Sequence, residues 1–189
     1  MKRRRSIRRI ENSGLQELLQ KCNFGNYQTP TEEHMKIRNR AMEFETSGSD
    51  WFFICGKPGT GKTHICTAIC NWLLDKGWEL RYMVWRTDAA ELKAMVNDRE
   101  EYKTAMNKLR NAAVLYIDDF FKGSITPGDV NLAFTILNDR YICKGKKTII
   151  SSELPISEIA KIDDAIAGRI AEKAKGYVLH APDLNWRAL

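Results

Sequence analysis

The stretch that decides the fold is WFFICGKPGTGKTHICTAI, residues 51–69. It opens with an unbroken apolar run, 51–55, and such runs are typical of strands that are covered on both faces in a parallel sheet. The next residues, 56–63, read GKPGTGKT and match the pattern G-x-x-x-x-G-K-[ST] without a substitution. The segment 63–75 then predicts a helix that ends before Gly77. A strand, a glycine-rich turn and a helix in this order predict a loop that binds phosphate.

Each residue type in this loop serves phosphate binding. Glycine allows the backbone to turn tightly and to approach phosphate oxygens at places where a Cβ atom would clash. Successive backbone N–H groups and the positive end of the following helix attract the anion. We expect Lys62 to reach the β- and γ-phosphates of a nucleotide and Thr63 to offer its hydroxyl to Mg²⁺. The expected phosphate-binding residues are Gly56, Lys57, Pro58, Gly59, Thr60, Gly61, Lys62 and Thr63.

Two adjacent carboxylates end a second apolar run. Residues 112–119 read AAVLYIDD, so Asp118 and Asp119 directly follow a predicted strand. The carboxyl ends of parallel strands share one edge of a sheet, and ligands bind at that edge. We therefore expect Asp118 to hold Mg²⁺ through water and Asp119 to polarise the water that attacks the nucleotide. The expected ligands are ATP or ADP together with Mg²⁺.

Strand and helix patterns alternate along the chain. This alternation predicts an α/β domain with a five-stranded, mainly parallel sheet between helices. One predicted strand, 80–85, falls between the two motif strands in sequence, as in the additional-strand division of P-loop proteins. The predicted strands are 51–55, 80–85, 112–117, 147–152 and 175–181. The predicted helices are 14–22, 31–44, 63–75, 88–97, 99–110, 127–143 and 163–174.

The net charge of the chain comes from its start. The 189 residues carry a net charge of +6, and residues 1–10 alone hold six lysines and arginines and no acid. The remaining 179 residues are balanced, with 24 basic and 24 acidic side chains. This basic tail either binds nucleic-acid phosphates or is a solvated leader, and both interpretations stay open.

Composition excludes several broad classes. With 43% hydrophobic residues the chain can bury a sizeable core, which excludes global disorder. The sequence has no apolar run of about 18 residues and no secretory signal, so we expect a cytoplasmic protein without a membrane contact. The five cysteines show no CxxC spacing, which favours buried reduced thiols over a disulfide framework or a zinc site.

Several motifs together resemble one family. They are similar to the AAA+ ATPases of the bacterial helicase-loader type (DnaC/DnaI) and to the related IstB-type transposition helpers, and the similarity covers roughly residues 3–189. The stretches that carry the resemblance are GKPGTGKTHICTAI at 56–69, VLYIDDF at 114–120, KTIISSEL at 147–154 and DDAIAGRIAEKAKGYVLHAPDLNWR at 163–187.

The resemblance implies roles for residues outside the two motifs. His64 joins the nucleotide-binding residues, Arg169 is a catalytic arginine finger that acts on the nucleotide of a neighbouring subunit, and Arg187 is a sensor-2-like arginine. Ser152, at the end of the sensor-1 strand, is also expected to bind nucleotide. Glu153 departs from the family, which often has asparagine there. This departure speaks against a γ-phosphate-sensing role at this position, because an acid repels phosphate unless it holds a water or an arginine.

The resemblance also divides the chain. It implies a basic tail or linker at 1–10, a helical lead-in at 11–46, and an AAA+ core at 47–189 without a sizeable C-terminal lid domain. Phe24 and Tyr27 in the lead-in either flank the adenine or serve packing only.

The function that the resemblance implies is that of an ATPase that helps to place a replicative hexameric DNA helicase on single-stranded DNA. Its subunits are expected to form a homo-oligomer when nucleotide or DNA is bound. Loaders of this family usually carry a helicase-binding domain before the basic linker, whereas Met1 directly precedes the linker here. The chain is therefore either a fragment or a protein with a separate docking surface.

Two alternatives stay open. The first is an IstB-type transposition helper that binds double-stranded DNA and a transposase. The second is a small P-loop kinase or a nucleotide-dependent binding module. A kinase needs a mobile, arginine-rich lid, and residues 122–129, KGSITPGD, look instead like a short loop.

Overall fold

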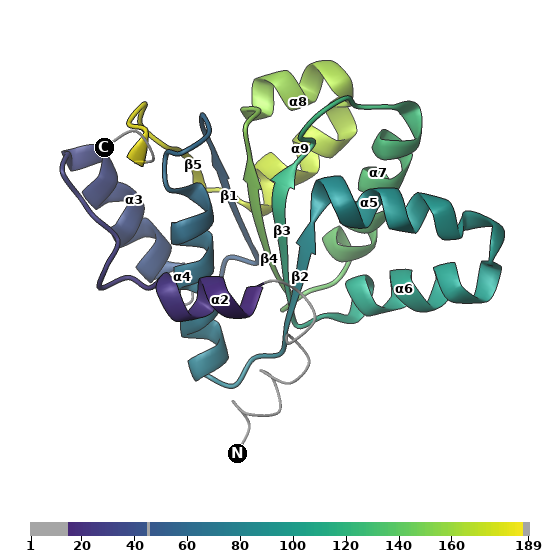
Figure 1. The fold of residues 1–189 in the computed structure, drawn as a ribbon, viewed down its shortest axis with the longest axis horizontal. Helices are drawn as coiled ribbons and strands as arrows, with labels where there is room; N and C mark the ends of the chain where they lie inside the picture. The colour runs from purple at the N-terminus through teal and green to yellow at the C-terminus, as the bar shows by residue number, and fades with distance from the viewer. Residues whose placement is uncertain (1–14, 45, 187–189) are drawn as a thin grey trace.

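The computed structural model describes residues 15–44 and 46–186, which form a five-stranded sheet between helices (Figure 1). The strands lie in the order β2-β3-β4-β1-β5, and each neighbouring pair is parallel. This architecture confirms the predicted fold class. The strand bounds are β1 Trp51–Cys55, β2 Leu80–Val84, β3 Val114–Phe120, β4 Lys147–Ser152 and β5 Val178–His180.

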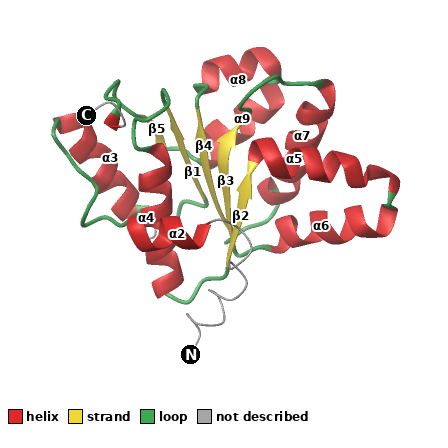
Figure 2. Cartoon of the chain, viewed as in Figure 1, coloured by secondary structure: helices red, strands yellow, loops and turns green. Residues whose placement is uncertain are grey.

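Helices cover both faces of the sheet (Figure 2). One face is covered by α2 (Leu15–Lys21), α3 (Glu32–Glu43) and α4 (Lys62–Asp75). The other face is covered by α5 (Trp85–Ala94), α6 (Arg99–Asn111), α7 (Pro127–Tyr141), α8 (Ile156–Ile162) and α9 (Asp164–Lys173), with a short 3-10 turn, Met95–Asn97, between α5 and α6.

Burial of β1 on both faces explains its unbroken apolar sequence. All five of its residues are buried, and successive side chains point to opposite faces of the sheet. Trp51 and Phe53 pack into the core formed with α5 to α9. Phe52 and Ile54 pack into the core formed with α2 to α4. The strand is therefore covered on both faces and paired on both sides, and it places the loop that follows it at the carboxyl edge of the sheet.

The strand that separates the two motif strands in the sheet is β4. It pairs with β1 on one side and with β3 on the other, whereas β2 lies at the edge of the sheet. The strand that we predicted between the two motif strands in sequence is β2, and it lies at the edge of the sheet. The strand that separates the two motif strands in the sheet is β4, which comes after both of them in sequence. The acids at the end of β3 consequently face the phosphate loop across the end of β4.

Several elements differ from the sequence-based prediction; strand β5, for example, is Val178–His180 rather than 175–181. Strand β3 extends through the acids to Phe120, because Asp118 still pairs in register with Val84 of β2 and an irregularity before Phe120 restores pairing with β4. Helix α5 begins at Trp85, directly after β2. Helix α8 was not predicted, because Pro155 and Asp163 enclose only two helical turns that carry little periodic signal.

Within the described residues, β5 is followed by no further α-helix. No helix in the described part of the chain is long and apolar enough to cross a bilayer.

Arg140 ties three segments together inside the fold. Its side chain is fully buried and donates hydrogen bonds to backbone carbonyls at the end of α6 and at Lys147, and to Thr148 Oγ1 at 2.9 Å. Burial lowers the pKa of Arg140 to about 10. The guanidinium therefore stays charged at neutral pH, with carbonyl oxygens as its main hydrogen-bond acceptors and the nearby charge of Asp50 acting in the same direction.

We expect Arg140→Met to lower the free energy of unfolding by about 3 kcal/mol or more, because the substitution leaves several buried carbonyl groups without donors. Urea denaturation followed by circular dichroism measures this loss. Arg110→Met is the matched control, because Arg110 makes an exposed ion pair with Asp139. Equal denaturation midpoints for the two variants would contradict the role assigned to Arg140.

Candidate nucleotide-binding site

The phosphate loop connects β1 to α4 at the carboxyl edge of the sheet. Gly59 has φ +81° and Gly61 has φ +85°, a backbone region that favours glycine. A Cβ atom on Gly59 would lie 2.0 Å from Asn185 Oδ1, so a larger residue would force the Asn185 side chain to move. Gly61 is the N-cap of α4 and offers no side chain, which leaves the first N–H groups of the helix to an anion.

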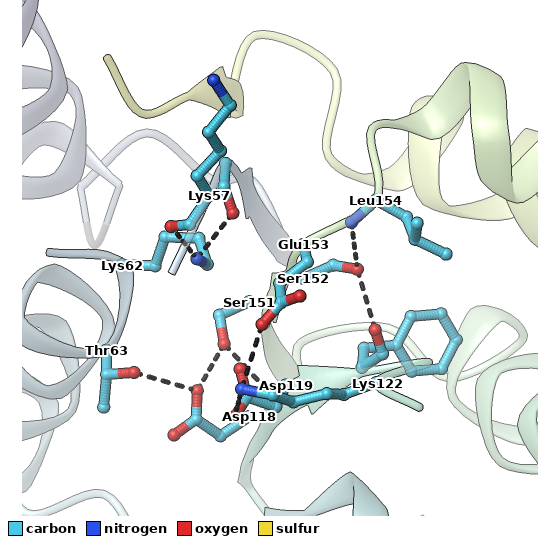
Figure 3. A network of polar contacts seen from close by, with 12 residues as sticks. Lys57, Lys62, Thr63, Asp118, Asp119, Lys122, Ser151, Ser152, Glu153 and Leu154 are labelled. Carbon is cyan, nitrogen blue, oxygen red and sulfur yellow. Dashed lines mark hydrogen bonds and ion pairs between the residues drawn. The ribbon is translucent and has the colours of Figure 1, made fainter. Parts of the chain in front are cut away.

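Lys62 lies inside the loop. Its side chain is buried, and Nζ donates hydrogen bonds to the carbonyl oxygens of Gly56 at 2.7 Å and Lys57 at 2.8 Å (Figure 3). Burial lowers the pKa of Lys62, while the nearby charges of Asp119 and Glu153 act in the opposite direction. Loop carbonyls thus hold the ammonium group at the place where a polyphosphate would meet it.

Asp118 is the centre of a hydrogen-bond network. Its Oδ1 accepts hydrogen bonds from Ser151 Oγ and from Thr63 Oγ1, the latter at 3.3 Å, and its Oδ2 accepts one from Tyr82 at 2.9 Å. Burial raises the pKa of the Tyr82 phenol, so it stays protonated and donates. The fold therefore brings together Thr63 and Asp118, the two residues that we expected to hold a metal.

These oxygen donors fit a magnesium ion. Mg²⁺ prefers oxygen ligands and usually keeps several waters, so one carboxylate and one hydroxyl beside a polyphosphate suffice. Among the described residues, no group of three histidines, cysteines or acids offers the richer cage of a transition metal.

Asp119 points into the pocket from a constrained backbone. Its φ is +55°, and its N–H donates a hydrogen bond to Ser151 Oγ at 3.1 Å. Its carboxylate lies 2.9 Å from Lys122 Nζ, which also contacts Glu153 at 3.0 Å (Figure 3). Phe121, two residues on, has φ +60°. Such backbone angles in residues other than glycine persist where the surrounding structure holds them, often at functional sites.

The two serines at the end of β4 have different partners. Ser151 links the acids, because it donates to Asp118 and accepts from the N–H of Asp119. Ser152, expected to bind nucleotide, instead donates to the carbonyl of Phe120 at 2.8 Å and accepts from the N–H of Leu154 at 3.1 Å. Ser152 does not line the pocket. Successive side chains of a strand point to opposite faces of the sheet, so only one of the two serines can meet the acids. The pairing of β3 with β4 shows which one does.

A cavity of about 460 Å³ opens over the phosphate loop. Its walls come from the loop, from the lead-in before β1, from the ends of β3 and β4, and from the described end of the chain. Lys62, Thr63, His64, Asp119 and Glu153 all line it. The fold thus collects most of the predicted site residues around one cavity.

Tyr27 and His64 line this cavity from the side of the lead-in. Their rings meet edge to face with centroids 5.4 Å apart, and His64 Nε2 lies 2.9 Å from Asn26 Oδ1. Among the described residues, the buried Tyr27 hydroxyl has no hydrogen-bond partner, and burial raises the pKa of Tyr27 to about 12. Phe24 instead packs against Trp72 and does not line the cavity.

Trp186 also lines the cavity, and the sequence analysis did not identify it as a site residue. Its backbone N–H donates to the carbonyl of Gly59 at 3.0 Å, and its ring meets His34 edge to face. In sequence it lies 127 positions from Gly59, and no local pattern marks such a contact.

The two arginines implied by the family resemblance lie outside this cavity or outside the described residues. Arg169, on α9, donates hydrogen bonds to Asn138 Oδ1 and to the carbonyl of Ala165, and its guanidinium lies over the rings of Phe134 and Tyr141. It does not line the cavity of its own chain. Arg187 falls outside the described residues.

A phosphate loop after a buried inner strand, with an acid pair across an intervening strand, defines a P-loop nucleotide-binding protein. The chain belongs to the family described as IstB-like ATP binding protein, which matches residues 2–174. The resemblance to AAA+ ATPases of the helicase-loader type is confirmed.

Relatives and solved structures agree with this assignment. The chain is 32% identical to YqaM of Bacillus subtilis (strain 168) over 95% of its length and 61% of YqaM. It is 34% identical to the replicative helicase loader DnaC of Escherichia coli (strain K12) over 63% of its length and 49% of DnaC. A crystal structure of the DnaC helicase loader superposes with a TM-score of 0.70 at 21% identity, covering 87% of this chain and 98% of that one. The chain thus spans about half to three fifths of these curated relatives.

We expect Ser151→Ala to raise the magnesium concentration needed for half-maximal ATP turnover by about tenfold or more, because the substitution frees Asp118 and the backbone of Asp119 from a shared partner. Magnesium titrations of ATP turnover measure the change. Ser157→Ala is the control, since Ser157 is exposed on α8. An unaltered magnesium requirement in Ser151→Ala would show that Ser151 does not organise the acids.

Proposed function

We propose that this chain hydrolyses Mg-ATP and couples the cycle to the placement of a replicative hexameric DNA helicase on single-stranded DNA. The observation that carries the ATPase part is the 3.3 Å contact of Thr63 with Asp118 beside the buried Lys62. These groups match the three tasks of a Mg-nucleotide site, which are metal binding, metal positioning and phosphate neutralisation.

Each residue has a separate task in hydrolysis. Thr63 and Asp118 hold the magnesium ion, which neutralises phosphate charge when it is bound. Lys62 contacts the β- and γ-phosphates as its hydrogen bonds to the loop carbonyls give way to phosphate oxygens. Asp119 orients the attacking water. Arg169 acts on the nucleotide of a neighbouring subunit in a homo-oligomer, which agrees with its place outside the cavity of its own chain.

The nucleotide base lies between the lead-in and the described end of the chain. Tyr27, His64 and Trp186 offer aromatic surface there, and Asn26 offers an amide. The family description, ATP binding, supports adenine as the base.

The loading role is supported by the match to DnaC, whose name describes a replicative helicase loader. The basic residues of 1–10 lie outside the described residues, and we propose that they contact DNA phosphates in the cytoplasm. The alternative, a transposition helper that binds DNA and a transposase, is supported by the IstB-like family description.

We expect Lys62→Ala to lower ATP turnover by about 100-fold or more, because it removes the ammonium group that stabilises phosphate charge. Phosphate release at saturating magnesium measures turnover. Lys76→Ala, at the exposed end of the same helix, is the control. Turnover in Lys62→Ala equal to that of the control would remove the ATPase assignment.

Retention of a hexameric replicative helicase by the immobilised chain tests the loading role. We expect ATP to change the amount retained, and Lys62→Ala to abolish this dependence, since the variant no longer responds to nucleotide. The parallel experiment uses an IS21-type transposase in place of the helicase. Retention of the transposase without retention of the helicase would favour the transposition helper.

A further inference from the structure

Lys122 is a second ammonium group in the nucleotide cavity, and neither sequence motif assigns it a task. Its Nζ lies 2.9 Å from Asp119 Oδ2 and 3.0 Å from Glu153 Oε1, and all three residues line the cavity (Figure 3). The hydrogen bond to Asp119, helped by the one to Glu153, raises the pKa of Lys122. Lys122 therefore carries its full charge at neutral pH.

The backbone on the Lys122 side of this pair is fixed. The rings of Phe120 and Phe121 are stacked with centroids 4.1 Å apart, and both pack edge to face against Trp85. Both phenylalanines are buried. The N–H of Lys122 donates to the carbonyl of Asp119 at 3.0 Å. The chain therefore presents the Lys122 side chain from a packed turn.

The backbone on the Glu153 side is equally fixed. Ser152 Oγ donates to the carbonyl of Phe120 and accepts from the N–H of Leu154, so it holds the residues on both sides of the turn. Glu153 lies between these two anchored positions. The parallel pairing of β3 with β4 therefore places Lys122 beside Glu153.

The negative charges around Lys122 favour a cation at its position. Asp119 and Glu153 together bring two negative charges to a cavity that is expected to hold a polyphosphate. An ammonium group has three N–H donors, and the two carboxylates accept two of them. Among the described residues, this arrangement leaves the third donor for a ligand.

We propose that Lys122 binds the γ-phosphate of ATP and that Glu153 is a positioning residue for it. The inference rests on the proposed function. Lys62 approaches the phosphates from α4, whereas Lys122 approaches from the end of β3, beside the acid that is proposed to orient the attacking water. Water attacks the terminal phosphate, so the γ-phosphate would lie on the Asp119 side of the cavity.

Binding of AMPPCP and of ADP, each with magnesium, to the full chain tests this proposal by calorimetry. We expect Lys122→Met to weaken AMPPCP binding by about tenfold, the loss of one charge-assisted hydrogen bond, and to leave ADP binding nearly unchanged. Lys122→Arg is expected to retain most of the preference for AMPPCP. Glu153→Gln is expected to reduce that preference by a smaller factor. Lys161→Met, in an exposed ion pair on α8, is the control.

The double variant Lys122→Met with Glu153→Gln separates this role from simple charge balance. If Lys122 only neutralises Glu153, the double variant regains AMPPCP binding, and the proposal is overturned. If Lys122 contacts the γ-phosphate, the preference for AMPPCP stays lost. Equal weakening of AMPPCP and ADP in Lys122→Met would also overturn the proposal. A wild-type chain that binds neither nucleotide would instead refute the proposed function.

Discussion

The parallel pairing of β3 with β4 determines where every acid of the site lies. Regular pairing runs up to Ile117 opposite Ile150, and it resumes at Phe120 opposite Ser152 after an irregularity. Asp118 and Asp119 occupy the interval between these points. Ser151 contacts both of them there. Its hydroxyl donates a hydrogen bond to the Asp118 carboxylate and accepts one from the backbone N–H of Asp119. Without this pairing the two acids would end an ordinary strand with no fixed relation to the phosphate loop.

Much of the site was predictable because it is local in sequence. The loop at 56–63 combines glycines, a lysine and a threonine whose spacing is set by the geometry of one turn. The acid pair is recognisable because it directly follows an apolar strand. Each feature lies within one segment, so a pattern in the sequence carries it without knowledge of the fold. The number of strands and their mainly parallel direction followed from the alternation of strand and helix, whereas their order in the sheet came only from the structure.

The residues that the sequence did not reveal depend on contacts between distant segments. Whether Ser151 or Ser152 meets the acids depends on the register with β3 and cannot be read from two identical neighbours. Lys122 looked like a loop residue until the structure placed it beside Glu153. Trp186 meets Gly59 only because the chain returns to the phosphate loop after β5. Helix α8 was missed for a different reason, since its two turns are too short for a periodic signal.

Arg140 gives the domain a mechanical property beyond its contribution to stability. One side chain on α7 donates hydrogen bonds to the end of α6 and to the start of β4. These segments lie at the end of the sheet opposite the nucleotide. They consequently open together or not at all, as one cooperative unit in hydrogen exchange. This end of the sheet thus forms a tied base, and the phosphate loop lies at the opposite edge.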